Sequence, residues 1–181
     1  RGGDAAVSGS VSLRYRVFDT PVGPLTVVCD PDAVGDLSHG PDGPVVASGF
    51  GDLADIVPSP HQDMAEAELA EVGAAVAAYF DGEVSALDRV AVAQAGPPFR
   101  RDAWNAMRKI PAGQVRSYAE LADLAGRPGA ARAAGSACAS NEVAPFVPCH
   151  RVVRTGGAVG QYGFGVATKE ALLRHEGYFR Q

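Results

Sequence analysis

The chain is poor in the features that mark disulfide-rich, zinc-bound and membrane-spanning proteins. It has three cysteines among 181 residues, and no two of them have Cys-x-x-Cys spacing. A disulfide framework and a structural zinc site are therefore not expected. No apolar run approaches the roughly 20 residues that a membrane-spanning helix needs. These absences predict a cytoplasmic protein whose cysteines remain free thiols.

Composition and turn residues predict a leader and two domains. A hydrophobic content of 46% with 20% charged residues is typical of a globular protein. Residues 1–12 lack the apolar core of a signal peptide and are rich in glycine and serine, so we expect a flexible leader. A Gly-Pro-Pro run at 96–98 marks a boundary. It predicts an N-terminal domain over residues 13–95 and a C-terminal domain over residues 96–181.

Charge is divided unevenly between the two halves. Residues 1–98 carry 4 basic and 15 acidic side chains, a net charge of −11, whereas residues 99–181 carry 12 basic and 6 acidic side chains, a net charge of +6. The two values together give the −5 of the whole chain. A basic half joined to an acidic one indicates either a surface that approaches phosphate or simple attraction between the halves.

The first half has the pattern of a small α/β unit. Residues 13–18 and 25–29 are rich in β-branched and aromatic residues and flank a turn, which predicts a hairpin. Short strands are also expected at 45–48 and 90–92. Apolar residues at helical spacing predict a helix within residues 64–80. We expect a small antiparallel sheet with one helix, and we find no catalytic cluster in this half.

The second half is predicted to be mostly helical. Apolar residues recur every four positions from Phe99, and the helix should stop at Ile110-Pro111. A Ser117-x-x-Glu120 capping box opens the next helix. After a Gly-rich turn, residues 130–140 form another. Two short helices joined by such a turn have the proportions of a helix-turn-helix.

The helix predicted over residues 130–140 consists almost entirely of small residues, with Arg132 as its one long side chain. Small residues let helices pack closely, which is a purely structural explanation. The alternative is a slim helix that enters a narrow DNA groove and carries one cation to the base stack. A sequence-specific regulator would display several polar side chains for base edges, so the pattern disfavours that function.

Cys149 is the strongest candidate for a reactive group. It lies in the run Pro148-Cys149-His150-Arg151, between a rigid proline and a cation. A thiol attacks carbon as thiolate, so a base must accept its proton. Neighbouring side chains of an extended segment point to opposite faces, so His150 would need a bridging water or a turn. A buried structural thiol is the alternative. Glu176 is a candidate for orienting the histidine.

Longer motifs extend this pattern across the second half. Their elements in chain order are Ile110-Pro111-x-Gly113-x-Val115-x-Ser117-Tyr118, Ala130-Ala131-Arg132-Ala133, Asn141, Pro148-Cys149-His150-Arg151-Val152-Val153, Gly157-x-Val159-Gly160-x-Tyr162 and Lys169-x-x-Leu172-Leu173-x-x-Glu176-Gly177. Together they closely resemble the O6-alkylguanine-DNA alkyltransferases, the methylated-DNA–protein-cysteine methyltransferases. In the first half the resemblance is limited to Thr20-Pro21-x-Gly23-x-Leu25 and Tyr79-Phe80-x-Gly82.

The resemblance implies a fold and a reaction. The expected fold is a ribonuclease H-like N-terminal α/β domain followed by a winged-helix-like C-terminal domain. Cys149 would accept the alkyl group, His150 would act as a base through water, Glu176 would hold His150, and Asn141 would brace the cysteine loop. Each molecule would react once, without metal or organic cofactor. Activity on O4-alkylthymine is left open.

The resemblance also implies contacts with double-stranded DNA. Tyr118 would bind the flipped guanine, Arg132 would fill its place in the stack, and the helix over 130–139 would lie in the minor groove. The full set of implied substrate and DNA contacts is Tyr118, Ala130, Ala131, Arg132, Gly135, Ser136, Val152, Tyr162, Gly163, Phe164 and Lys169. The protein is expected to be a monomer in solution, with cooperative binding to DNA left open.

Two positions depart from the family's pattern. Small residues usually follow the tyrosine at 162, whereas this chain has Phe164. Its ring would either wall the pocket and restrict bulky adducts such as benzyl or turn outward. Cys138 lies on the predicted DNA helix as a bystander or an oxidation-sensitive contact.

Three other functions remain as alternatives to the transferase. One is a module that binds alkylated DNA and signals the lesion to other repair pathways, which the presence of Cys149 disfavours. The second is a helix-turn-helix regulator, and the third is a cysteine hydrolase, for which no oxyanion hole is identified.

Overall fold

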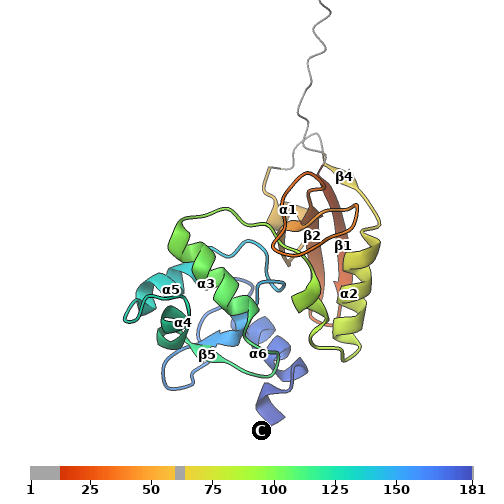
Figure 1. The fold of residues 1–181 in the computed structure, drawn as a ribbon. Coiled ribbons are helices and arrows are strands. Elements are labelled where there is room, and N and C mark those ends of the chain that lie inside the picture. Colours follow the sequence, from red (N-terminus) through yellow and green to blue (C-terminus); the bar gives the residue numbers. More distant parts are fainter. Residues whose placement is uncertain (1–12, 60–63, 181) are drawn as a thin grey trace, which may run out of the picture.

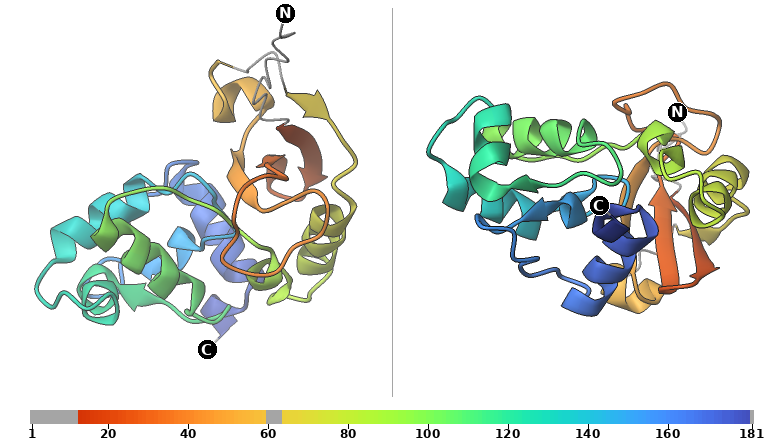
Figure 2. Two further views of the ribbon diagram at one scale, coloured as in Figure 1. Left: turned by 45° about the horizontal axis from the view of Figure 1, so that its top comes forward. Right: turned by 90° about the horizontal axis from the view of Figure 1, so that it is seen from below.

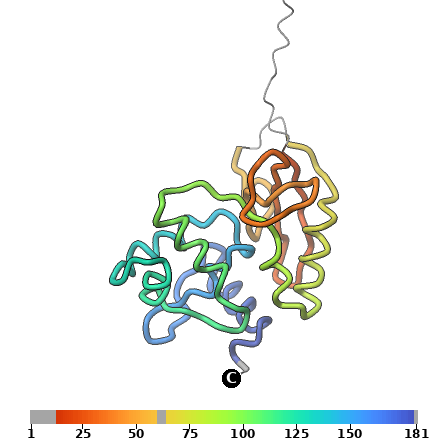
Figure 3. Tube along the Cα trace, viewed as in Figure 1, coloured from red at the N-terminus to blue at the C-terminus, as the bar shows by residue number. Residues whose placement is uncertain are grey.

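The computed structural model describes residues 13–59 and 64–180, and they form two halves that pack side by side (Figures 1 and 3). The predicted leader, residues 1–12, lies outside the described residues. Within the described ranges, no helix is both long and apolar enough to cross a membrane.

The N-terminal half is a four-stranded sheet with one long helix. Its elements are β1 (Arg14–Thr20), β2 (Gly23–Cys29), β3 (Val45–Phe50), α1 (Leu53–Ile56), β4 (Ala65–Glu66), α2 (Ala70–Phe80) and the 3-10 helix η1 (Ala86–Arg89). The strand order is β3-β2-β1-β4. The predicted hairpin is confirmed, since Thr20 pairs with Gly23 across the turn, and Gly23 has a φ of +108°.

Three details of this half differ from the sequence-based expectation. The sheet is mixed, because β4 runs parallel to β1 while the other pairs are antiparallel. The helix begins at Ala70 because residues 65–66 pair with β1 as a strand. The strand expected at 90–92 is reduced to a single bridge between Val45 and Val92. Short edge segments have too few residues for a period to identify them.

The C-terminal half is mainly helical, as predicted. Its elements are α3 (Pro98–Arg108), β5 (Arg116–Ser117), α4 (Tyr118–Leu124), α5 (Ala131–Ala139), the 3-10 turn η2 (Cys149–Arg151), β6 (Val152–Val153), α6 (Val166–His175) and η3 (Tyr178–Arg180). The strands β5 and β6 form a short parallel pair. The ribonuclease H-like and winged-helix-like descriptions of the two halves remain predictions.

The predicted capping box starts α4. The Ser117 hydroxyl accepts a hydrogen bond from the Glu120 amide at 3.1 Å, and the Glu120 carboxylate accepts one from the Ser117 amide at 2.9 Å. Helix α5 buries Ala134 and Ala137 against the core. The Trp104 indole of α3 donates to the Ala137 carbonyl at 2.9 Å. Small residues on α5 therefore do serve close packing on one face.

The two halves share polar contacts as well as a common hydrophobic core. Ser48, on β3, donates from its amide to the Glu142 carbonyl at 2.8 Å and from its hydroxyl to the Ala144 carbonyl at 2.8 Å. Two further views show the sheet beside the C-terminal helices (Figure 2). The sheet thus holds the segment that leads to Cys149.

Candidate active site

The segment over residues 141–148 carries Cys149 into the interior and is held by side chains from both halves. The Asn141 side-chain amide donates to the Val147 carbonyl at 2.8 Å. Gln94, from the connection between the halves, donates to the Asn141 side-chain oxygen at 3.2 Å and accepts from the Glu142 amide at 2.7 Å. Asn141 therefore lies against the cysteine loop.

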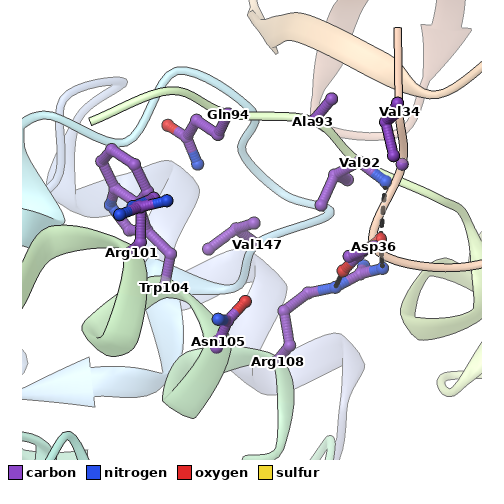
Figure 4. Close-up of a pocket in the computed structure, with 11 residues that line it drawn as sticks. Val34, Asp36, Val92, Ala93, Gln94, Arg101, Trp104, Asn105, Arg108 and Val147 are labelled. Atoms are coloured by element: carbon purple, nitrogen blue, oxygen red, sulfur yellow. Dashed lines mark hydrogen bonds and ion pairs between the residues drawn. The ribbon is translucent and has the colours of Figure 1, made fainter. Parts of the chain in front are cut away.

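Arg108 at the end of α3 is a second support of this segment. Its guanidinium donates to the Phe146 carbonyl at 2.9 Å and forms an ion pair with Asp36 at 3.2 Å. Further bonds reach the Val90 and Leu87 carbonyls. Arg108 and Asp36 line a cavity of about 210 Å³ between α3 and the loop that joins β2 to β3 (Figure 4).

Replacing Arg108 by methionine is expected to lower the free energy of unfolding by about 3 kcal/mol, because buried carbonyls and Asp36 lose a charged donor. Urea unfolding at neutral pH measures the change. The matched control is Arg101→Met, since Arg101 lines the same cavity but is exposed. Equal losses for the two variants would contradict the supporting role of Arg108.

Cys149, His150 and Arg151 form a single 3-10 turn, closed by a hydrogen bond from the Arg151 amide to the Pro148 carbonyl at 2.9 Å. Neighbouring residues of an extended segment point to opposite faces, so Cys149 and His150 needed either a bridging water or a turn to act together. The structure has the turn. All three side chains are buried. The turn directs both the His150 and the Arg151 side chains to one carboxylate.

That carboxylate is Glu176, directly after the last residue of α6. Its Oε2 lies 2.8 Å from Nε2 of His150, and its Oε1 lies 2.8 Å from Nε of Arg151. Burial alone would raise the pKa of Glu176, but the charges and hydrogen bonds of His150 and Arg151 hold it well below its usual range. Glu176 therefore remains an anion in the interior.

The contact with Glu176 fixes which ring nitrogen of His150 carries a proton. An ionised carboxylate can only accept, so Nε2 of a neutral His150 is the protonated nitrogen and Nδ1 keeps its lone pair. Nδ1 is buried and has no hydrogen-bond partner among residues 13–59 and 64–180. The ring is thus prepared to accept a proton at Nδ1.

Cys149 opens on a cavity of about 260 Å³. The lining residues come from α4, α5, η2 and the loop before α6, and they are Tyr118, Gly135, Cys138, Ala139, Cys149, Gln161, Tyr162 and Gly163. Burial raises the pKa of the Cys149 thiol, while Asn141 and Lys169 lower it. A base is therefore needed to take the thiol proton.

The cavity brings together some of the predicted contact residues and leaves others apart. Tyr118, Gly135, Tyr162 and Gly163 share it with Cys149. Lys169 is fully buried behind it, donating to the Val152 carbonyl at 2.7 Å and to the Gln161 carbonyl at 3.1 Å. The other predicted contact residues of α5 and its N-cap do not line this cavity. Arg132 and Ser136 are exposed, and Ala130 and Ala131 are half-buried.

Phe164 does not line the cavity. Its ring lies behind Tyr162, with ring centroids 5.3 Å apart, and reaches Phe50 of the N-terminal sheet at 5.8 Å. Gly49 makes this approach possible, because a Cβ at that position would lie 2.5 Å from the Phe164 ring. The ring of Phe164 therefore takes neither of the two expected positions. It does not form a wall of the cavity, and it does not turn outward, but packs behind Tyr162.

The N-terminal half contributes two residues that no sequence pattern indicated. Tyr79 donates its hydroxyl to Oε2 of Glu176 at 2.7 Å, and Asp88 pairs with Arg151 at 3.2 Å. In the sequence, Tyr79 belongs only to the motif Tyr79-Phe80-x-Gly82. A tyrosine and an aspartate more than 60 residues from Cys149 give no local signal that they meet its neighbours.

Comparison with protein families gives a match over residues 98–178 to the DNA-binding domain of 6-O-methylguanine DNA methyltransferase. A Mycobacterium tuberculosis methylated-DNA–protein-cysteine methyltransferase is 37% identical over 175 residues, covering 91% of this chain and 92% of the relative. A Shigella flexneri protein of the same name is 51% identical over 100 residues, which is 55% of this chain. That match spans only 58% of the Shigella protein.

Solved structures give a similar result. The crystal structure of Mycobacterium tuberculosis OGT in complex with DNA has a TM-score of 0.70 and 32% identity, covering 90% of this chain and 92% of that one. The O6-methylguanine-DNA methyltransferase of Pyrococcus kodakaraensis shares the fold, with a TM-score of 0.58 and 22% identity over 91% of this chain and 99% of that one.

Proposed function

Because this chain belongs to the methylated-DNA–protein-cysteine methyltransferase family, we propose that it repairs alkylated guanine in DNA by transferring the alkyl group to Cys149. The observation that carries the proposal is the geometry around Cys149. A buried thiol opens on a cavity, and the adjacent His150 is held at one nitrogen by Glu176. Its other nitrogen has no partner within the described part of the chain.

The reaction is a displacement at the alkyl carbon. Nδ1 of His150 takes the thiol proton through a bridging water, and Glu176 stabilises the resulting imidazolium. The sulfur forms a bond to the alkyl carbon while the bond from that carbon to guanine O6 breaks. The electron pair of the broken bond stays on the guanine, which takes up a proton and is restored. No metal or cofactor takes part in this scheme.

Access to O6 requires the base to leave the duplex, at a cost of roughly a few kcal/mol. We propose that α5 enters the minor groove of double-stranded DNA, since small residues and the exposed Arg132 form its outer face. Arg132 would fill the vacated place in the stack. Tyr118, at the start of α4 and on the cavity, would bind the flipped base.

A thioether has no easy hydrolytic exit, so each molecule should react once. The test is to mix the protein with excess duplex that contains labelled O6-methylguanine and to follow transfer over time. The proposal predicts that transfer stops at one methyl group per chain. Continued turnover would support a hydrolase instead, and binding of the lesion without transfer would support a module that signals damage to other repair pathways.

The chain would act as a monomer on one lesion, in a cytoplasmic setting that keeps its thiols reduced. O4-alkylthymine in DNA would be a second substrate, to be compared with O6-methylguanine.

Phe164→Gly is expected to speed the reaction with O6-benzylguanine and to change the reaction with O6-methylguanine little. Loss of the ring frees Tyr162 to move back, which enlarges the cavity beside Cys149. Competition between the two substrates measures the effect, and Phe179→Gly is the control because Phe179 is an exposed aromatic residue. Benzyl reactivity that is unchanged by Phe164→Gly would show that Phe164 does not limit adduct size.

A further inference from the structure

Glu176 receives a hydrogen bond from a residue outside the C-terminal half. The Tyr79 hydroxyl, on α2, lies 2.7 Å from Oε2 of Glu176. The same oxygen lies 2.8 Å from Nε2 of His150. Tyr79 and His150 therefore share one carboxylate oxygen, and both side chains are buried.

Tyr79 can serve only as a donor in this position. Burial, together with the charge of Glu176, raises the pKa of the Tyr79 hydroxyl far above its usual value. The ring is itself fixed by an edge contact with Phe80 and a tilted contact with His175, each with ring centroids 4.9 Å apart. The hydroxyl is thus a rigid neutral donor that partly offsets the negative charge of Oε2.

The first half also contributes a charge on the far side of the network. Asp88 pairs with Nη1 of Arg151 at 3.2 Å, and Arg151 binds both oxygens of Glu176. Coulomb contributions add, so the negative charge of Asp88 partly cancels the positive charge of Arg151 at Glu176. Asp88 therefore limits how far Arg151 compensates Glu176.

We propose that Tyr79 is a positioning residue of the alkyl-transfer site, by which the N-terminal half holds Glu176 against His150 and sets the strength of the base that serves Cys149. The inference rests on the proposed function. The titratable and charged groups around the network are Tyr79, Asp88, Cys149, Arg151, Tyr162, Lys169 and His175.

The two N-terminal residues should act in opposite directions. Without the Tyr79 hydroxyl, Oε2 is less compensated, so it favours an imidazolium at His150 and the base becomes protonated at higher pH. Without the Asp88 charge, Arg151 binds Glu176 more fully, which disfavours the imidazolium and moves the same transition to lower pH. A purely structural role of either residue predicts no such shift.

The test uses the full chain in the wild-type, Tyr79→Phe, Asp88→Asn and Tyr15→Phe forms. Tyr15→Phe is the control, because it removes a hydroxyl from β1, outside the network. Single-turnover methyl transfer from an O6-methylguanine duplex is measured against pH. In parallel, iodoacetamide labelling of Cys149 is measured by peptide mass spectrometry, and thermal unfolding checks that each variant is folded.

For Tyr79→Phe we expect the acid-side midpoint of both profiles to rise by about half a unit, so that transfer at pH 7 falls by up to about three-fold. For Asp88→Asn the midpoint should fall, and for Tyr15→Phe it should not move. A folded Tyr79→Phe with an unchanged midpoint, or shifts of equal sign in both variants, would overturn the proposal.

Two outcomes separate this inference from the proposed function. If Tyr79→Phe does not fold, an unmoved midpoint in Asp88→Asn overturns the inference alone. If the iodoacetamide profiles shift as expected while the wild-type protein transfers no methyl group, the role of Tyr79 stands and the proposed function fails.

Discussion

Replacing Cys149 by alanine is expected to abolish alkyl transfer completely and to leave binding to duplex DNA unchanged. Cys149 is the thiol that both opens on the cavity and adjoins His150 in the 3-10 turn. Without sulfur no bond to the alkyl carbon can form, whereas the exposed face of α5 that is proposed to contact DNA is untouched. Label transfer and a fluorescence-anisotropy titration with the same duplex measure the two properties.

Cys138 provides the matched control for this experiment, since it lines the same cavity on α5. Burial and the nearby Cys149 raise the pKa of the Cys138 thiol, and it has no histidine beside it in the chain. Cys138→Ala should therefore still accept one label at Cys149. If the label disappeared in Cys138→Ala and persisted in Cys149→Ala, Cys138 and not Cys149 would be the acceptor.

Glu176→Gln should have the second-largest effect, with transfer slowed by about 100-fold or more because His150 loses the anion that stabilises its protonated form. The variant should also lose about 3 to 5 kcal/mol of unfolding free energy, since Arg151 keeps a buried charge without its main partner. Glu170→Gln, on the same helix α6 but outside the site, is the control. Similar losses in both variants would contradict the role of Glu176.

The stability effect of Glu176 should depend on pH in a stated direction. Its folded-state pKa is depressed below the usual 4.5. The stabilisation it gives is therefore complete above about pH 5 and is lost as pH falls below about 4.5 toward the folded-state pKa. The difference in unfolding free energy between the wild type and Glu176→Gln should shrink between about pH 5 and pH 3. A difference in unfolding free energy that grows as the pH falls would contradict a depressed folded-state pKa of Glu176.

Local sequence signals predicted much of the C-terminal half. The Ser117-x-x-Glu120 box located the start of α4, and the small residues after Gly129 located α5. Such signals work because capping and helical period are properties of neighbouring residues. The segment order and the family resemblance singled out Cys149, His150 and Glu176. The structure joins His150 to Glu176 and puts Cys149 in the same 3-10 turn as His150.

The contacts that cross between the halves could not be predicted in the same way. Tyr79 reads as the end of an amphipathic helix, and Arg108 as the basic last turn of another. Their hydroxyl and guanidinium groups acquire a role only when the sheet and the helices pack together. Phe164 departs from the family's pattern, but the direction of its ring depends on Gly49 in the other half.

The most direct measurement is the site and number of methyl groups that the protein carries after reaction. The intact chain is incubated with excess duplex bearing an isotopically labelled O6-methylguanine, and the protein is then digested and its peptides are analysed by mass spectrometry. The proposed function predicts one label per chain, on the sulfur of Cys149, with unmodified guanine left in the DNA. Label on another residue, more than one lesion repaired per chain, or a bound lesion without label would contradict it.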